Sequence, residues 1–321
     1  MKVTVIVTVK NEGDGLRPLL DSLIDQTYYA DEVVICDGGS TDDTLEVLTE
    51  YKQYLPLKII VAPGSNISQG RNRAIEASSG QIIAVTDAGV VLAPDWLEEI
   101  VRPIASGETA VVSGWFEPDP YTDFEVVMGA TVLPERREID PEKFLPSSRS
   151  VAFTRTAWAE VDGYPEWLDY GEDLVFDNAL REKYGPFPFA SKAVVYFRPR
   201  GSLRSFFRQY YLYARGDGKA NLWPARHLIR YFTYLIMLPF ILRLIWRDKW
   251  PGWILLLLGI GAYSRRPAER LWGSTWGWRP PVRLRAFALI PIIRFVGDIA
   301  KMLGYPAGLV WRHRKFKKAS S

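Results

Sequence analysis

Short apolar runs alternate with segments of helical spacing through the first hundred residues. The runs cover residues 3–9, 32–36, 58–61 and 82–86, and they are too short for buried helices. Between them, apolar residues recur every three or four positions in 16–24, which is typical of an amphipathic helix, and a further helix is expected at 68–79. This alternation predicts an α/β fold with a mostly parallel sheet and helices on both of its faces.

The pattern becomes less regular after residue 97. Further strands are predicted at 110–113 and 150–154, and the Pro-rich segment 117–146 between them is interpreted as a loop over an active site. Gly171 then precedes a helix whose apolar positions include Leu174, Phe176 and Leu180. We expect the first domain to comprise residues 1–220.

The remaining residues, 221–321, predict a helical membrane-associated region. Apolar segments at 231–242 and 250–264 have uncharged runs of 12 and 15 residues, shorter than the roughly 20 that cross a bilayer. A hairpin over 228–264 could therefore be tilted in the bilayer or lie at its interface. Residues 282–311 predict an amphipathic helix bent near Pro291, because their charged residues fall within a narrow arc, and a basic tail follows it.

Charge divides the chain in the same way. Residues 201–321 contain 22 Lys and Arg against 4 Asp and Glu, whereas residues 1–200 contain 18 against 33. A basic half rich in Trp, Leu and Ile favours an anionic membrane surface over nucleic acid as the partner. The single cysteine, Cys36, excludes an intramolecular disulfide and fits a reducing compartment. The apolar run 3–9 is too short and too β-branched for a signal peptide, so we expect a cytoplasmic catalytic domain at the cell membrane.

Two acidic positions are candidates for chemistry. Asp87 follows the strand 82–86 at its carboxyl end, where open α/β sheets bind ligands, and Ala88-Gly89 permits close approach of a polyphosphate or a metal ion. Glu172 and Asp173 open a helix at the end where the helix dipole favours acids. Each position has an ordinary alternative: Asp87 could begin a turn, and the two helix acids could be structural.

Five segments in order resemble the family 2 glycosyltransferases, which have the GT-A fold. They are residues 8–12, 37–44, 70–72, the strand ending in Asp87, and 171–173. The resemblance covers roughly residues 1–220.

The resemblance implies roles for single residues. Thr8, Glu12 and Asp37 would line a nucleoside pocket, and Arg71 would lie near the nucleotide. Asp87 would be the first acid of an Asp-X-Asp motif and a metal ligand, although Gly89 stands at the third position, so a divalent ion is expected to be weakly held. Asp173 would be the general base, with Glu172 helping to position the acceptor. The helix 204–220, with Arg215, resembles in position one that closes over the donor in processive members, although Gln-X-X-Arg-Trp is absent; a packing helix is the alternative.

These residue types suit sugar transfer. A leaving diphosphate must be neutralised, by Mg²⁺ or Mn²⁺ on Asp87 or by Arg71 or Arg215, and a carboxylate must take the proton of the acceptor hydroxyl. One base opposite the leaving group implies inversion. We therefore expect inverting transfer from a nucleotide-diphosphate sugar to a hydroxyl of a lipid-linked or envelope saccharide at the cytoplasmic membrane face. The alternatives are a polyprenyl-phosphate glycosyltransferase and a catalytically dead nucleotide-binding scaffold.

Overall fold

The computed structural model describes residues 1–319, which form two compact units. The first unit comprises Met1–Asp119 and Arg136–Arg198, and the second comprises residues 120–135 and the chain from Pro199 onward. The domain boundary expected near residue 220 differs from this division. Helix α8 (Leu203–Ala220) and helix α5 (Asp123–Val132) both pack within the second unit.

The first unit is built on a mixed eight-stranded sheet in the order β3-β2-β1-β4-β7-β6-β8-β5. The first four strands run parallel, as the alternating pattern predicts, and β7 pairs antiparallel with β4 and β6. The strands are β1 (Val3–Val9), β2 (Glu32–Asp37), β3 (Leu57–Val61), β4 (Ile82–Val85), β5 (Val90–Leu92), β6 (Val111–Pro118), β7 (Val151–Thr154) and β8 (Phe189–Phe197).

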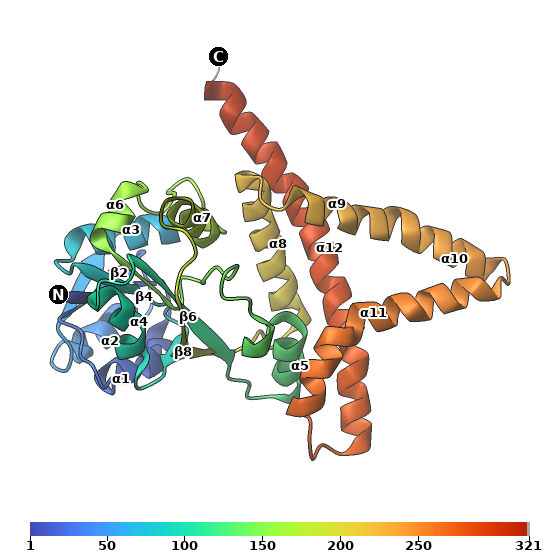
Figure 1. Ribbon diagram of the computed structural model, residues 1–321, viewed down its shortest axis with the longest axis horizontal. Coiled ribbons are helices and arrows are strands. Elements are labelled where there is room, and N and C mark those ends of the chain that lie inside the picture. Colours follow the sequence, from blue (N-terminus) through green and yellow to red (C-terminus); the bar gives the residue numbers. More distant parts are fainter. Residues whose placement is uncertain (320–321) are drawn as a thin grey trace. The chain divides into compact units, whose positions relative to one another are not determined.

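Helices cover both faces of this sheet, as Figure 1 shows. Alternate residues of a strand point to opposite faces, so Val5 and Val7 pack with one set of helices and Ile6 with the other. The first set is α1 (Arg17–Ile24), α2 (Thr44–Tyr51) and α4 (Trp96–Ala105); the second is α3 (Ile67–Ala77), α6 (Arg155–Glu160) and α7 (Glu172–Tyr184). Cys36 is fully buried, and burial raises the pKa of its thiol, as expected for a small core residue.

The segment predicted as a loop at 117–146 contains helix α5, so that interpretation is wrong for these ten residues. The Thr122 hydroxyl caps the helix by accepting from the Glu125 amide. Val127 and Met128 are buried in the apolar core of the second unit. Because Pro residues and mixed charges lie on either side of this short apolar helix, the segment shows no clear helical period in the sequence.

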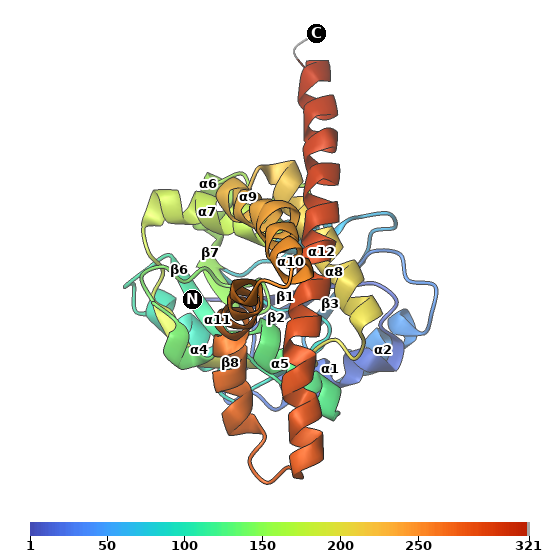
Figure 2. The same ribbon diagram turned by 90° about the vertical axis from the view of Figure 1, so that its right-hand side faces the viewer.

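The second unit is helical. Its other helices are α9 (Pro224–Phe232), the π-helical turn η3 (Thr233–Met237), α10 (Leu238–Trp246), α11 (Trp250–Ser274) and α12 (Pro280–Ala319). Figure 2 shows α12 beside α8. The amphipathic helix expected at 282–311 is part of α12, which continues through Pro291.

Helix α12 contacts α8 through glycines. A Cβ added at Gly304 would lie 2.2 Å from the Tyr211 carbonyl oxygen, and one at Gly308 would lie 2.2 Å from that of Arg215. The buried residues of α12 follow a spacing of three and four, through Ala286, Ile290 and Ile293. The two backbones are therefore in direct contact, as small residues permit.

Helices α9 to α11 form a hairpin that extends away from α8 and α12 (Figure 1). Within residues 1–319, one helical stretch is long and apolar enough to cross a membrane, Pro224–Trp246, and none of its apolar window is buried. In α11, Leu257 and Leu258 are also exposed. Most of the apolar surface of the hairpin is therefore not covered by the protein.

We predict that Gly304→Ala destabilises the second unit, because the new methyl group must displace the Tyr211 carbonyl. Such overpacking costs about 1–3 kcal/mol. Gly261→Ala, in α11, is the matched control, since its Cβ would meet no atom within 4 Å. Alanine there should be neutral or stabilising, because it favours helix by up to ~1 kcal/mol. Thermal unfolding in detergent measures both, and equal melting temperatures for the two variants would contradict the packing described here.

Candidate active site

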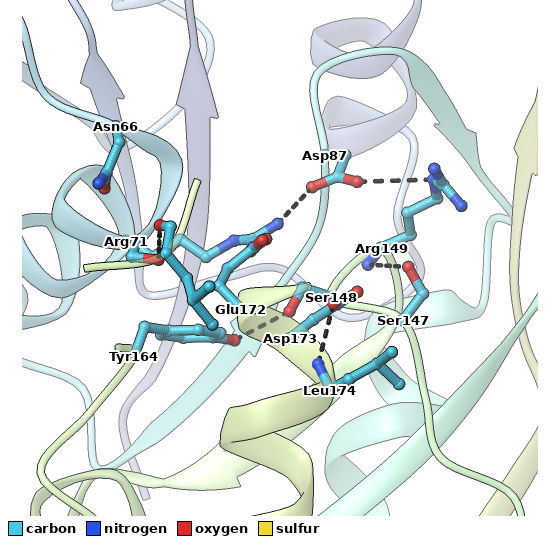
Figure 3. A network of polar contacts seen from close by, with 12 residues as sticks. Asn66, Arg71, Asp87, Ser147, Ser148, Arg149, Tyr164, Glu172, Asp173 and Leu174 are labelled. Atoms are coloured by element: carbon cyan, nitrogen blue, oxygen red, sulfur yellow. Dashed lines mark hydrogen bonds and ion pairs between the residues drawn. The ribbon is translucent and has the colours of Figure 1, made fainter. Parts of the chain in front are cut away.

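Arg71 connects the two acidic positions singled out by the sequence, as Figure 3 shows. Its Nη1 lies 2.7 Å from Glu172 Oε1 at the start of α7, and its Nη2 lies 2.9 Å from Asp87 Oδ1 after β4. Three segments that are far apart in the sequence thus meet at one guanidinium group.

This guanidinium is almost completely buried, with 3% of the side chain exposed. It lies over the Tyr164 ring, 5.2 Å from the ring centre. Burial opposes its charge, but Asp87 and Glu172 raise the pKa of Arg71 above its already high ordinary value. Arg71 therefore stays charged and forms ion pairs with these two carboxylates.

Asp87 has a second cationic neighbour, Arg149, which the sequence analysis missed. The Nε atom of Arg149 lies 3.5 Å from Asp87 Oδ2, and its guanidinium stacks over the Phe197 ring at 4.5 Å. Its side chain is 23% exposed, so this cation is more accessible than Arg71. Arg149 lies in the irregular segment before β7, and no sequence pattern marks it.

The adjacent residues Gly70, Arg71 and Asn72 have three different structural roles. A Cβ at Gly70 would lie 2.9 Å from Thr8 Cγ2, so glycine lets α3 approach β1. The Asn72 amide donates to the Tyr164 carbonyl at 2.9 Å, and its oxygen accepts from the Tyr164 amide at 2.9 Å. Asn72 thus fixes the loop that leads to α7, while Arg71 holds the start of that helix.

Asp173 lies at the first turn of α7, and its side chain is only partly buried. Gly171 precedes the helix with φ of 77°, a left-handed conformation that favours glycine. Asp173 Oδ1 accepts from the Leu174 amide at 2.9 Å. Burial raises the pKa of Asp173 against the lowering effect of Arg71, and the charge of Asp87 raises it further. A carboxylate with a raised pKa is a better proton acceptor than an ordinary one.

Glu172 has a different environment, with 7% of its side chain exposed. Burial, and next the charge of Asp173, raises its pKa to about 7, although Arg71 acts in the opposite direction. Because the Glu172 carboxylate is bound to Arg71, any effect on an acceptor would pass through that arginine. Its expected part in acceptor positioning stays a prediction.

A third acid, Asp177, lies one helical turn after Asp173 and was missed by the sequence analysis. It is fully buried, and neither carboxylate oxygen has a hydrogen-bond partner within the described residues. Burial, and next the charge of Asp173, raises its pKa well above the ordinary value of an aspartate. Its only sequence signal is an acid on the apolar face that carries Phe176 and Leu180.

The expected nucleoside residues lie at the carboxyl edge of β1 and β2. Thr8 pairs with Cys36 and Asp37 with Val9, so the two predicted residues lie one register position apart, on opposite faces of the sheet. The buried Asp37 carboxylate accepts from the amides of Gly39 and Ser40 at 3.0 and 2.9 Å, and it therefore shapes its own loop. Glu12 is exposed after β1. Arg215 lies in α8 of the second unit. The binding roles of these residues stay predictions.

The residues around Asp87 fit a weakly held metal ion but not one held by the protein alone. Within residues 1–319, no three His, Cys, Asp or Glu side chains are grouped as metal ligands. Asp87 is 27% exposed, and both of its oxygens already face arginines. It could give a divalent ion one carboxylate ligand, with the remaining ligands coming from phosphates and water.

Known proteins share this site-bearing segment. Residues 4–153 match the family model described as glycosyl transferase family 2. This match covers 150 of the 321 residues and includes Arg71, Asp87 and Arg149. One relative, the uncharacterized glycosyltransferase YibD of Escherichia coli (strain K12), is 34% identical over 101 residues, which cover 31% of this chain and 29% of that protein. The chain thus spans about a third of the length of the first curated relatives that it matches.

Two solved structures resemble almost the whole chain. Mannosyltransferase PcManGT from Pyrobaculum calidifontis, in complex with GDP-Man and Mn²⁺, has a TM-score of 0.55 at 20% identity and covers 97% of this chain and 86% of its own. S. aureus TarS 1–349 in complex with UDP-GlcNAc has a TM-score of 0.53 at 19% identity and covers 99% and 92%. At these identities the similarity concerns the fold, and it confirms the GT-A-type α/β sheet followed by a helical region.

We predict that Asp177→Asn stabilises the protein at pH 8 but not at pH 4. An ordinary Asp titrates near ~3.9 in the unfolded chain. The pKa of Asp177 is raised in the folded protein. Its contribution to the stability of the fold is therefore fully present below the pKa of the unfolded chain and is lost as the pH rises. Asparagine has a similar size and does not titrate, so the variant does not lose stability at this position as the pH rises. We expect a gain in melting temperature of at least about 2–4 °C at pH 8, which corresponds to roughly 1 kcal/mol.

Asp140→Asn is the control for this experiment. A hydrogen bond from Lys143 lowers the pKa of the exposed Asp140, so this substitution should give no gain at pH 8. A lower melting temperature of Asp177→Asn at pH 8 would mean that Asp177 is charged and paired in the folded protein.

Proposed function

We propose that the protein is an inverting glycosyltransferase that transfers a sugar from a nucleotide-diphosphate sugar to a hydroxyl of a lipid-linked or envelope saccharide. The observation that carries this proposal is the position of Asp173. Asp173 is a partly exposed residue whose carboxyl group has a raised pKa, beside the pair formed by Arg71 and Asp87. The match of residues 4–153 to the model of glycosyl transferase family 2 supports the same reaction class.

Asp173 would act as the general base. Its carboxylate would accept the proton of the acceptor hydroxyl while the bond from the sugar to the diphosphate breaks on the opposite face, which inverts the anomeric centre. Glu172 and Arg71 would hold the start of α7 in place through their 2.7 Å ion pair. Glu172 would thereby influence the acceptor indirectly.

The leaving diphosphate needs positive charge. A divalent ion, Mg²⁺ or Mn²⁺, would supply it when bound, with Asp87 as its one protein ligand. The structural neighbour PcManGT was solved in complex with GDP-Man and Mn²⁺, which is consistent with such an ion. Arg149 lies beside Asp87 and could contribute charge to the same group.

The donor would bind at the carboxyl edge of β1 and β2. We propose that Thr8, Glu12 and Asp37 surround its nucleoside and that Arg71 lies behind the phosphates. Arg215 stays a predicted donor-binding residue. The two structural neighbours are complexes with UDP-GlcNAc and GDP-Man, so a nucleotide sugar is the common class.

A membrane location fits the second unit. The hairpin of α9 to α11 exposes apolar side chains on most of its sides, whereas a helix that lies on a membrane surface has a polar face. We therefore favour insertion of the hairpin into the bilayer over the interfacial alternative. The first unit would work on the cytoplasmic face of the cell membrane.

A polyprenyl-phosphate glycosyltransferase is the second candidate, because the same hairpin would bring the enzyme to a lipid phosphate. Such an acceptor is already an anion and needs no base. A catalytically dead scaffold is less well supported, since Asp87, Arg71 and Asp173 are together at one site.

We predict that Asp173→Asn retains donor binding but lowers the rate of transfer by roughly 10²–10⁴, the usual contribution of a general base. The amide keeps the size of the carboxylate and cannot accept the proton. Glu182→Gln, an exposed change on the same helix, is the control and should transfer normally. Donor affinity by calorimetry and transfer from a panel of nucleotide sugars are the measurements. Near-normal transfer by Asp173→Asn would favour the polyprenyl-phosphate alternative.

We also predict that Gly89→Asp strengthens metal binding. A Cβ at Gly89 would meet no atom within 4 Å, so the new side chain fits without displacing its surroundings. Two carboxylates should raise Mn²⁺ affinity in the presence of nucleotide by about tenfold or more. Gly89→Asn, which adds a neutral side chain, is the control. Tight Mn²⁺ binding by the nucleotide-free wild type would contradict a weakly held ion.

A further inference from the structure

A cluster of charged and phenolic side chains lies at the base of the apolar hairpin. Asp298 of α12 accepts from Arg230 Nε at 2.7 Å and from the Tyr234 hydroxyl at 3.0 Å, and the Tyr263 hydroxyl also donates to it. These partners come from α9, η3 and α11. The Asp298 carboxylate is therefore fully engaged in joining the hairpin to α12.

Two further cations lie on the same face of α12. Arg294 precedes Asp298 by four residues and Lys301 follows it by three, so all three share one side of the helix. Arg294 lies over the Tyr263 ring at 4.0 Å, and Lys301 lies over the Tyr210 ring at 4.7 Å. In the part of the chain that the structure describes, neither cation forms an ion pair with a carboxylate.

The electrostatic environment of Lys301 shows an excess of positive charge. Burial, and next the charge of Arg230, lowers its pKa to about 8, and Arg294 acts in the same direction. Asp298 and Asp217 act against them but do not compensate. A bound anion would restore the balance and stabilise the charged amine.

The position of the cluster indicates the kind of anion. The exposed apolar residues begin within one or two turns of Arg230, with Phe232, Leu235 and Ile236. Where apolar helices enter a bilayer, basic side chains at their ends meet the phosphate groups of lipids. A soluble anion would have no reason to bind beside such a surface.

We propose that Arg294 and Lys301, with Arg230 behind them, form a binding site for the phosphate of a lipid whose chains lie along the hairpin. The proposal rests on the membrane location proposed above, and it adds a specific headgroup site to it. The site would hold either a lipid of the bilayer or a lipid-borne acceptor by the same chemistry.

The test uses the full chain and flotation with vesicles of phosphatidylcholine, with and without phosphatidylglycerol. Arg294→Gln/Lys301→Gln should still bind phosphatidylcholine vesicles but should lose its preference for phosphatidylglycerol by about five- to thirtyfold, given ~1 kcal/mol for each basic residue near the surface. Arg243→Gln/Arg266→Gln removes the same charge from exposed positions of the hairpin helices and should lose much less. Equal losses in both double variants would show a diffuse basic surface and overturn the proposal.

The wild type provides a second readout that does not depend on the folding of a variant. Lys301 is charged below about pH 8 and neutral above it. Phosphatidylglycerol keeps one charge in this range, so the preference should fall between pH 7 and pH 9. A preference that is constant over this range, or one abolished by inorganic phosphate at matched ionic strength, would overturn a lipid phosphate site at Lys301.

Failure here is distinguishable from failure of the proposed function. A protein that transfers sugar in detergent but shows no phosphatidylglycerol preference would contradict the lipid site alone. A protein that shows the preference but transfers no sugar from any nucleotide donor would contradict the enzyme and leave the lipid site supported.

Discussion

The buried ion pairs of Arg71 are the constraint on which the rest of the first unit depends. One guanidinium joins α3, the end of β4 and the start of α7 through Asp87 and Glu172. Removing one member of a buried pair typically costs 3–5 kcal/mol, about a third or more of the stability of many domains, because the remaining charge has no partner. Asn72 and Gly70 support the same arrangement from the neighbouring positions of α3.

An excess of acids gives this site its chemistry. Asp87, Glu172, Asp173 and Asp177 lie near two guanidinium groups, those of Arg71 and Arg149. Burial, and then the charges of neighbouring acids, raises the pKa values of the three acids on α7. Asp177 is fully buried, whereas Asp173 is more exposed and is the carboxylate that we propose as the proton acceptor.

Much of this arrangement could be predicted from the sequence. Short β-branched runs marked the parallel strands, and the resemblance of five ordered segments brought Arg71, Asp87 and Asp173 to one site. Arg149 and Asp177 could not be predicted in the same way. Arg149 lies in an irregular segment, and Asp177 is an acid in a helix, a residue type that is usually exposed until tertiary packing buries it. Helix α5 was missed because it is only ten residues long and lies between segments with Pro residues and mixed charges.

The most direct test of the account is a double-mutant cycle between Arg71 and Glu172. Arg71→Gln, Glu172→Gln and the double variant are compared with the wild type by equilibrium unfolding. We predict that the double variant loses less stability than the two single variants together, with a coupling of about 1–3 kcal/mol. Arg71→Gln leaves the buried Glu172 without its cation, and Glu172→Gln leaves the buried Arg71 with Asp87 as its only carboxylate partner. Additive losses, with a coupling below about 0.5 kcal/mol, would contradict the central place of this ion pair.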